Sequence, residues 1–242
     1  MQTWQLTKTP RLSGQQNMDY DLKLLADFEE GRIPSTLRIY SWQPKCITLG
    51  YAQKVDQEID VEKARELGWD VVKRPTGGGI VFHNEAEVTY SLVTALDNPL
   101  LPKGMIASYK KISEAIAWAL KQFGIEAEVQ NSKIKVKNKF QAPSSKLKTN
   151  LCFSYPAEYE IVVGGRKIVG SAQKRGKKAL LQQGSIFVRE TPKDIFQVLK
   201  KPYQEQDAVS VEEVAGKSFS FGEIGKVLVF GFEKVLGVKL QP

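Results

Sequence analysis

Apolar residues recur at helical spacing in two long stretches of the chain. Residues 15–30 and 106–124 carry an apolar side chain at about every third or fourth position, which is typical of amphipathic helices. Local start and stop signals predict three further helices: one over 60–68 with Asp60 as its N-cap, one opened by Thr191-Pro192 with threonine as the cap, and one that begins with a capping box at 220–223.

Short runs of β-branched and aromatic residues predict strands. They occur at 36–42, 46–51, 69–74, 79–82, 87–93, 158–163, 166–172 and 184–188. The first two flank Pro44 and are expected to form a hairpin-like pair, and Gly164-Gly165 predicts a tight hairpin turn between 158–163 and 166–172. Because the strands come in clusters with helices between them, the pattern favours an α+β fold with a mixed, largely antiparallel sheet flanked by helices.

No repeat, low-complexity tract or Pro/Gly/Ser-rich linker divides the chain, so we expect a single domain over residues 1–242. Hydrophobic residues make up 42% and charged residues 26%, which is ordinary for a soluble globular protein. The N-terminal stretch is unlike a signal peptide, and no segment has the length and apolarity of a membrane span. We therefore expect a cytoplasmic protein that has no membrane partner.

The chain has two cysteines, far apart in sequence, and one histidine. These numbers argue against a disulfide framework and against a zinc site, and we expect no metal or dissociable cofactor. The net charge of +8 indicates either a lysine-rich solvated surface or an anionic partner, and charge alone does not choose between them.

Three consecutive glycines, Gly77, Gly78 and Gly79, stand between Arg74 and the single histidine, His83, in the stretch KRPTGGGIVFHNE. Glycine allows positive φ and close approach of a ligand to the backbone, and bare N–H groups in such a turn bind anions or carbonyl oxygens. The stretch fits neither the P-loop pattern nor the dinucleotide-binding pattern. By itself it indicates a glycine-rich turn beside polar side chains.

The wider stretch KRPTGGGIVFHNEAEVTYSL resembles the signature of the lipoate–protein ligase and octanoyltransferase family. NMDYDLKLL and LRIYSWQPKCITLGYAQ upstream, and GRKIVGSAQKR with LLQQGSIFV downstream, resemble further family segments in family order. The resemblance implies the fold shared with biotin ligases and class II tRNA synthetase cores. It also implies an acyl pocket whose residues are Arg74, Gly77, Gly78, Gly79, His83, Gly170, Ser171 and Ala172. One departure is Asn84, where the family usually has aspartate.

Cys152 distinguishes the two chemistries within this family. Ligases activate a free acid with ATP, whereas transferases take octanoyl from acyl carrier protein and hold it as a thioester on cysteine. NLCFSYPAEYEIVV resembles the cysteine segment of the cysteine-type octanoyltransferases, which implies Cys152 as nucleophile and Lys167 as the cation that lowers the pKa of its thiol. Cys46 lies in a predicted strand and is interpreted as a packing residue.

The resemblance therefore favours an octanoyl-[acyl carrier protein]:protein N-octanoyltransferase of lipoate biosynthesis. Its donor would be octanoyl-acyl carrier protein, and its acceptor a lysine of a lipoyl-domain protein such as glycine cleavage H protein. An ATP-dependent lipoate–protein ligase and a non-catalytic acyl-carrier-binding protein remain the alternatives, because the glycine loop also resembles that of the ligases.

A basic run over 132–148 has lysines at every second position from 133 to 139, which would place their charges on one side of a strand. We interpret the run either as a solvated surface or as a docking surface for the acidic carrier protein. Phe140 is the only aromatic residue in it, so single-stranded nucleic acid is not an expected partner.

Overall fold

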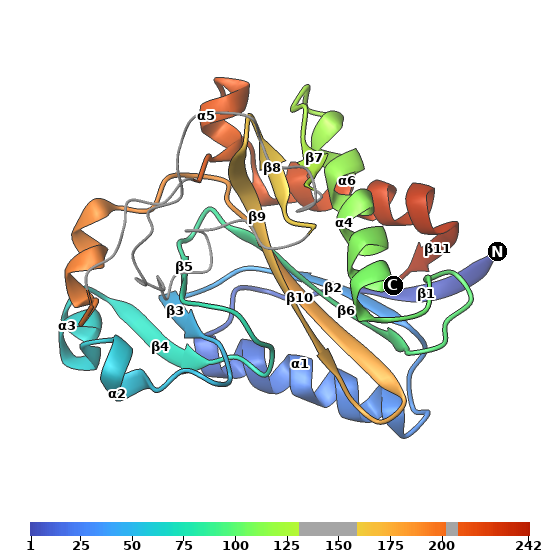
Figure 1. The fold of residues 1–242 in the computed structure, drawn as a ribbon, viewed down its shortest axis with the longest axis horizontal. Helices are drawn as coiled ribbons and strands as arrows, with labels where there is room; N and C mark the ends of the chain where they lie inside the picture. The colour runs from blue at the N-terminus through green and yellow to red at the C-terminus, as the bar shows by residue number, and fades with distance from the viewer. Residues whose placement is uncertain (131–158, 202–207) are drawn as a thin grey trace, which may run out of the picture.

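The computed structural model describes residues 1–130, 159–201 and 208–242. Within these ranges eight strands form one large mixed sheet (Figure 1). Their order across the sheet is β11 (Val238–Gln241), β1 (Gln2–Lys8), β2 (Thr36–Tyr40), β6 (Val88–Ala95), β10 (Ala179–Ile186), β9 (Arg166–Arg175), β8 (Ile161–Val163) and β7 (Glu128–Val129). β1 pairs in parallel with β11 and β2, and all the other pairs are antiparallel. The predicted fold class, α+β with a largely antiparallel mixed sheet, is confirmed.

A smaller sheet packs beside the large one, in the order β4 (Trp69–Lys73), β3 (Lys45–Leu49), β5 (Val81–His83). The hairpin-like pair predicted around Pro44 is wrong, because β2 belongs to the large sheet and β3 to the small one. β2 is buried along its whole length and has β1 and β6 on its two edges, while β3 has β4 and β5 on its edges. Tertiary partners therefore occupy every edge that a local hairpin would have used.

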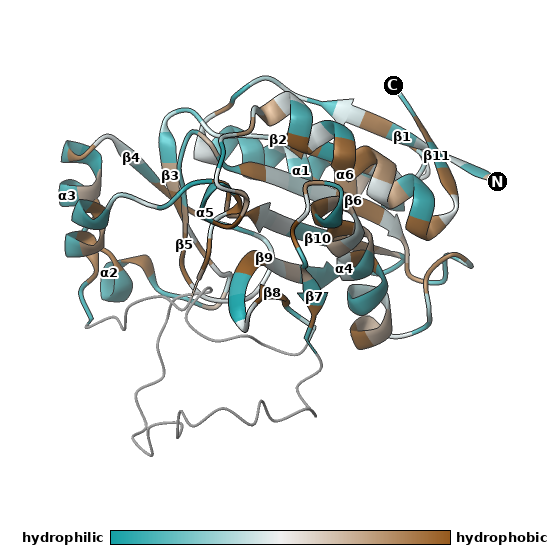
Figure 2. Ribbon diagram, turned by 90° about the horizontal axis from the view of Figure 1, so that it is seen from above, coloured by the Kyte–Doolittle hydropathy of each residue, from teal (hydrophilic) through white to brown (hydrophobic). Residues whose placement is uncertain are grey.

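Three long helices cover the two faces of the large sheet: α1 (Gly14–Glu29), α4 (Met105–Lys121) and α6 (Phe221–Leu236). Alternate residues of one strand divide between the faces, since Leu92 joins the core beneath α4 and α6 while Val93 packs with Leu24 and Leu25 of α1. In Figure 2 hydrophobic colour lies on the strands β6 and β10 in the middle of the molecule, and more hydrophilic colour lies on the short helices at its periphery.

Most of the predicted turn and cap signals are confirmed. Asp60 caps α3 (Val61–Glu66), Ser220 and Glu223 form the capping box of α6, and both glycines of the turn between β8 and β9 have positive φ. Short helices complete the described chain: α2 (Val55–Glu58), α5 (Val211–Ala215) and η1 (Lys193–Val198).

The helix predicted after Thr191-Pro192 is the 3₁₀ helix η1, and the position of its cap is one residue later than expected. Pro192 takes the N-cap position, and no side chain caps the helix. Thr191 is buried instead of capping. Among the helices that the structure describes, none combines the length and apolarity that crossing a bilayer requires.

Candidate functional site

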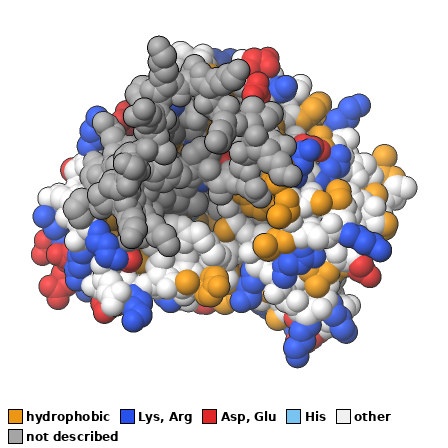
Figure 3. Space-filling view, in the orientation of Figure 1, with side chains coloured by type: hydrophobic (Ala, Val, Ile, Leu, Met, Phe, Trp, Pro, Cys, Tyr) orange, Lys and Arg blue, Asp and Glu red, His pale blue; other side chains and the backbone are white. Residues whose placement is uncertain are grey.

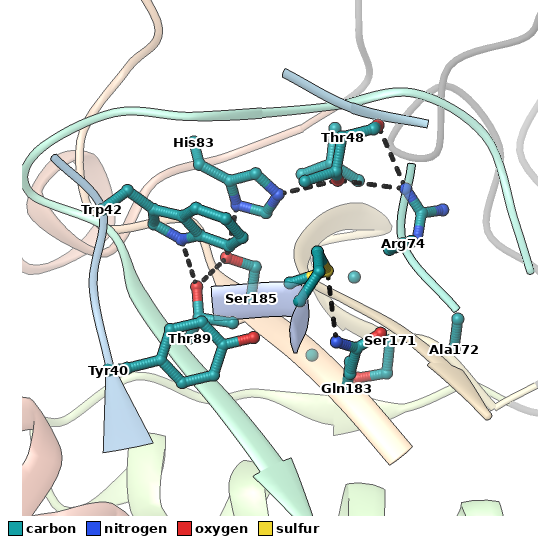
Figure 4. Close-up of a pocket in the computed structure, with 14 residues that line it drawn as sticks. Tyr40, Trp42, Thr48, Arg74, His83, Thr89, Ser171, Ala172, Gln183 and Ser185 are labelled. Atoms are coloured by element: carbon teal, nitrogen blue, oxygen red, sulfur yellow. Dashed lines mark hydrogen bonds between the residues drawn. The ribbon is translucent and has the colours of Figure 1, made fainter. Parts of the chain in front are cut away.

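A pocket lies where the small sheet meets the middle strands of the large sheet (Figure 4). Its walls come from α1, from β2 and β6, from β3 and β5, and from the facing segments of β9 and β10. The residues that line it are Met18, Tyr40, Trp42, Thr48, Arg74, Val81, His83, Thr89, Gly170, Ser171, Ala172, Gln183, Gly184 and Ser185. Segments distant in sequence thus bring together five of the residues singled out above: Arg74, His83, Gly170, Ser171 and Ala172.

The predicted pocket residues Gly77, Gly78 and Gly79 are not among the described residues that line this pocket, but the lining residue Arg74 fixes their loop. Its buried guanidinium donates from Nη2 to the carbonyl oxygens of Gly77 at 2.7 Å and Gly79 at 2.6 Å. Gly78, between them, has φ of +92°, which only glycine adopts readily. A Cβ on Gly50 would overlap the Gly78 carbonyl, so a second glycine allows the loop to lie against β3. The loop is therefore a fixed element beside the lining residues.

His83 is held on three sides. Its ring stacks on the Trp42 indole with centroids 4.2 Å apart. Its Nε2 lies 2.9 Å from Thr48 Oγ1, and its Nδ1 lies 2.9 Å from an oxygen of Glu87. Glu87 was not singled out from the sequence, since a glutamate before a strand carries no signal of the partner that it will meet in the fold.

Lys167 is a buried cation with a buried carboxylate beside it. It is 1% exposed, and its Nζ lies 2.9 Å from Glu160 Oε1, just ahead of the neighbouring strand β8. Burial raises the pKa of Glu160 above its usual value, and the charge of Lys167 opposes that rise. Glu160 was missed because only the hairpin register of β8 and β9 brings it to Lys167.

Asn84 has a defined structural role. Its side-chain nitrogen donates to the carbonyl of Arg189 at 3.0 Å, and its oxygen accepts from the backbone N–H of Ala86 at 2.9 Å. An aspartate could accept from Ala86 but could not donate to Arg189. The amide is thus the side chain that fits this turn.

A buried aspartate that the sequence analysis did not select organises the pocket floor. Asp21 of α1 accepts hydrogen bonds from Arg38 at 2.7 Å, Ser91 at 2.7 Å, Tyr40 at 2.9 Å and Gln183 at 2.7 Å. Burial, and then the charge of Asp21, raises the pKa of Tyr40 well above its ordinary value. Tyr40 therefore stays a neutral donor.

The segment Gly170–Ala172 forms the opposite wall and is fixed by its neighbours. Ser171 Oγ lies 3.0 Å from the Tyr90 hydroxyl, and its carbonyl accepts from Tyr109 of α4 at 3.1 Å. Burial raises the pKa of Tyr90 to about 12. A Cβ on Gly184 would overlap both Tyr90 and Ser171, so this glycine is required for the wall to close.

Two of the predicted features cannot be placed. Cys152 and the basic run over 132–148 lie outside the described residues. Cys46 is fully buried between α1 and the strands, and burial raises the pKa of its thiol well above the ordinary value, so its interpretation as a packing residue is confirmed. In the described part of the chain, no cluster of three or more acidic, histidine or cysteine side chains has the geometry to hold a metal.

Comparison with known proteins assigns the chain to a family. The lipoyl protein ligase A/B catalytic domain matches residues 13–233. Octanoyltransferase LipM of Kyrpidia tusciae is 36% identical over 252 residues, which cover 100% of this chain and 90% of that protein. Octanoyltransferase LipM of Moorella thermoacetica is also 36% identical, over 100% of this chain and 89% of its own length.

Solved structures show the same fold. Lipoate-protein ligase A bound with ATP superposes with a TM-score of 0.77 at 22% identity, over 100% of this chain and 88% of its own. The bipartite lipoate protein ligase of Thermoplasma acidophilum superposes with a TM-score of 0.76 at 20% identity, over 100% of this chain and 86% of its own.

Proposed function

The chain belongs to the lipoyl protein ligase A/B catalytic domain family, and from this we propose that it is an octanoyltransferase of lipoate biosynthesis, an acyltransferase. The observation that carries the proposal is full-length similarity, at 36% identity, to proteins named octanoyltransferase LipM. The pocket between the sheets supports it, because it brings Arg74 and His83 of the first family motif together with Gly170–Ala172 of the second.

In the proposed first step the Cys152 thiolate attacks the carbonyl of the carrier-bound octanoyl thioester. The carrier thiol leaves, and the octanoyl group stays on Cys152 as a new thioester. In the second step the ε-amine of a lipoyl-domain lysine attacks this thioester, the Cys152 thiolate leaves, and the amine loses a proton. The first step converts one thioester into another, and the second converts a thioester into an amide. Neither step needs ATP, because the acyl group is already activated as a thioester.

Lys167 would favour the Cys152 thiolate, because a nearby ammonium lowers the pKa of a thiol. Its burial supports this role, since a cation in a low-dielectric environment acts more strongly than a solvated one. Backbone N–H groups of the glycine loop or of Gly170–Ala172 would bind the oxyanion that forms in each step.

The donor that we propose is octanoyl-acyl carrier protein, and the acceptor is a lipoyl-domain protein such as glycine cleavage H protein. The test is multiple-turnover transfer to the acceptor, followed by mass spectrometry, from octanoyl carrier protein without ATP and separately from free octanoate with ATP and magnesium. We expect turnover in the first mixture alone. Turnover that requires ATP would identify a ligase, and turnover in neither mixture would favour a non-catalytic acyl-carrier-binding protein.

A further inference from the structure

A line of buried polar side chains connects the start of β6 with the glycine loop. It runs from Glu87 through His83 and Thr48 to Arg74, and these side chains belong to residues that are 1%, 4%, 1% and 7% exposed. Figure 4 shows Thr48 between the His83 ring and the Arg74 guanidinium, with hydrogen bonds drawn to both. The last member, Arg74, binds the carbonyl oxygens of the loop.

The residues at the two ends, Arg74 and Glu87, determine which atom donates and which accepts in each hydrogen bond of the line. A guanidinium only donates, so the Nη1–H of Arg74, 3.1 Å from Thr48 Oγ1, makes that oxygen an acceptor. The hydroxyl proton of Thr48 then remains for His83 Nε2 at 2.9 Å. At the other end a carboxylate only accepts, so His83 Nδ1 carries the proton and donates it to Glu87 at 2.9 Å. Ser185 Oγ lies 3.3 Å from the same nitrogen, where it can accept from that N–H while its own proton is directed to Thr89 Oγ1 at 3.1 Å.

We propose that Glu87 is a positioning residue of this site. Its carboxylate fixes His83 in the Nδ1–H tautomer, and through Thr48 this keeps Arg74 aligned on the glycine loop. Both ring nitrogens of His83 are occupied by this arrangement, so the histidine aligns the pocket and does not carry a proton during the reaction. The consequence for acyl transfer rests on the proposed function, whereas the tautomer does not.

A glutamine in place of Glu87 would no longer determine the donor and acceptor roles along the line. Its amide nitrogen can donate to Nδ1, which moves the ring proton to Nε2. Thr48 Oγ1 would then receive protons from both His83 and Arg74, and its own hydroxyl would lose its acceptor on the ring. The carboxylate of Glu87 also lowers the stability of the folded protein, because its Oε1 is buried and has no hydrogen-bond partner among the described residues. Stability alone therefore does not explain a glutamate here.

The chain has a single histidine, so ¹⁵N-histidine labelling gives one pair of ring signals in the full-length protein. We expect the wild type to show a protonated Nδ1 and an unprotonated Nε2. Glu87→Gln should shift this to the Nε2–H form or to a mixture, whereas Glu85→Gln, an exposed glutamate two positions earlier, should leave the spectrum unchanged. A wild type with Nε2 protonated, or a Glu87→Gln spectrum like that of the wild type, would overturn the proposal.

Kinetics tests the consequence for the loop. Glu87→Gln should lower kcat/KM for octanoyl transfer by roughly ten- to a hundredfold, the loss that small misplacement of a positioning group causes, while its thermal midpoint stays at or above that of the wild type. Thr48→Ser should keep the Nδ1–H tautomer. Thr48→Val should keep it too, because Glu87 still accepts from Nδ1, but it should lower kcat/KM, because it removes the hydroxyl that connects His83 with Arg74. A Glu87→Gln enzyme with a changed tautomer and an unchanged rate would contradict positioning. If the wild type transferred no octanoyl group, the proposed function would fail while the tautomer assignment stood.

Discussion

Glu160 and Lys167 are buried together in the folded protein. The free energy of unfolding therefore depends on the protonation of Glu160. Burial raises its folded-state pKa above the usual value of 4.5. Between the unfolded and folded pKa values the folded protein holds more protons than the unfolded chain, so the free energy of unfolding falls as the pH rises through that window. Below pH 4.5 this stabilisation is fully present.

Glu160→Gln removes that contribution, and we expect the stability difference between wild type and variant to change with pH above 4.5, in the direction that disfavours the wild type. Urea unfolding of both proteins at a series of pH values measures it. The measurement is the difference between the two curves. Four other carboxyl groups have lowered pKa values in the folded state and make both proteins more stable as the pH rises, and they cancel in this difference: Asp27, Glu29, Glu212 and Glu223. Parallel curves would contradict the assignment.

Asn84→Asp tests whether this chain needs the amide. The substitution removes the donor to the Arg189 carbonyl and places two acceptors against each other, so we expect a loss of about 1–3 kcal/mol in the free energy of unfolding at pH 7. Asn98→Asp is the matched control, because its nitrogen donates to the Thr94 hydroxyl at 2.7 Å, and a hydroxyl can reverse and donate. Equal losses in both variants would rule out the explanation.

At the scale of elements, α4 and α6 approach closely because of Gly231. A Cβ there would overlap the carbonyl oxygen of Ala115, which belongs to the backbone of α4 and cannot move aside. Gly231→Ala should therefore reduce stability by about 1–3 kcal/mol, as overpacking does. Gly225→Ala in the same helix meets only Ile39 Cγ2 at 3.6 Å, and it should raise stability by up to about 1 kcal/mol through helix propensity. Urea unfolding of the two variants compares them directly, and a destabilised Gly225→Ala would show that helix propensity does not explain the pair.

The elements that the sequence predicts well are those with local signals. The capping box at Ser220 and the Gly164-Gly165 turn need only neighbouring residues, and both are found in the structure. The pairing of β1 with β11 joins the two ends of the chain, with Gln2 beside Val238, and no local pattern indicates it. The prediction of a hairpin at Pro44 was wrong for the same reason, since tertiary packing determines which strands pair.

The residues of the site also divide into those with a local sequence signal and those placed by tertiary packing. Arg74 and His83 stand in a recognisable motif and lie in one pocket with Gly170–Ala172. Their buried partners Glu87 and Asp21 carry no motif of their own, because a carboxylate becomes a partner only when another element places a donor beside it. Sequence motifs therefore predicted five of the residues that line the pocket, and tertiary packing determines the other lining residues and the buried partners.

At the scale of the whole molecule, the net charge of +8 suits association with an acidic partner. On the face shown in Figure 3, Lys and Arg side chains are spread around the rim. Transfer from carrier protein should therefore slow as ionic strength rises, because salt screens surface charges over about 8 Å at physiological concentration. Transfer from octanoyl-coenzyme A should change much less.

Neutralising the basic run tests whether its lysines dock the carrier. Replacing Lys133, Lys135, Lys137 and Lys139 by glutamine should slow transfer from carrier protein and spare octanoyl-coenzyme A. The matched control removes the same charge from exposed positions of and around α6: Lys217, Lys226, Lys234 and Lys239. Equal slowing in the two variants would mean that net charge matters and the basic run does not.

The central claim, a thioester on Cys152, is tested most directly by the intact mass of the protein after mixing with octanoyl carrier protein without ATP. We predict that the wild type gains one octanoyl group that neutral hydroxylamine removes, and that Cys152→Ser retains no such adduct. Turnover should fall by several powers of ten in the variant, as when a nucleophile is lost. A Cys152→Ser enzyme that keeps more than roughly a tenth of the wild-type rate, or a wild type that is acylated only with ATP, would contradict the account.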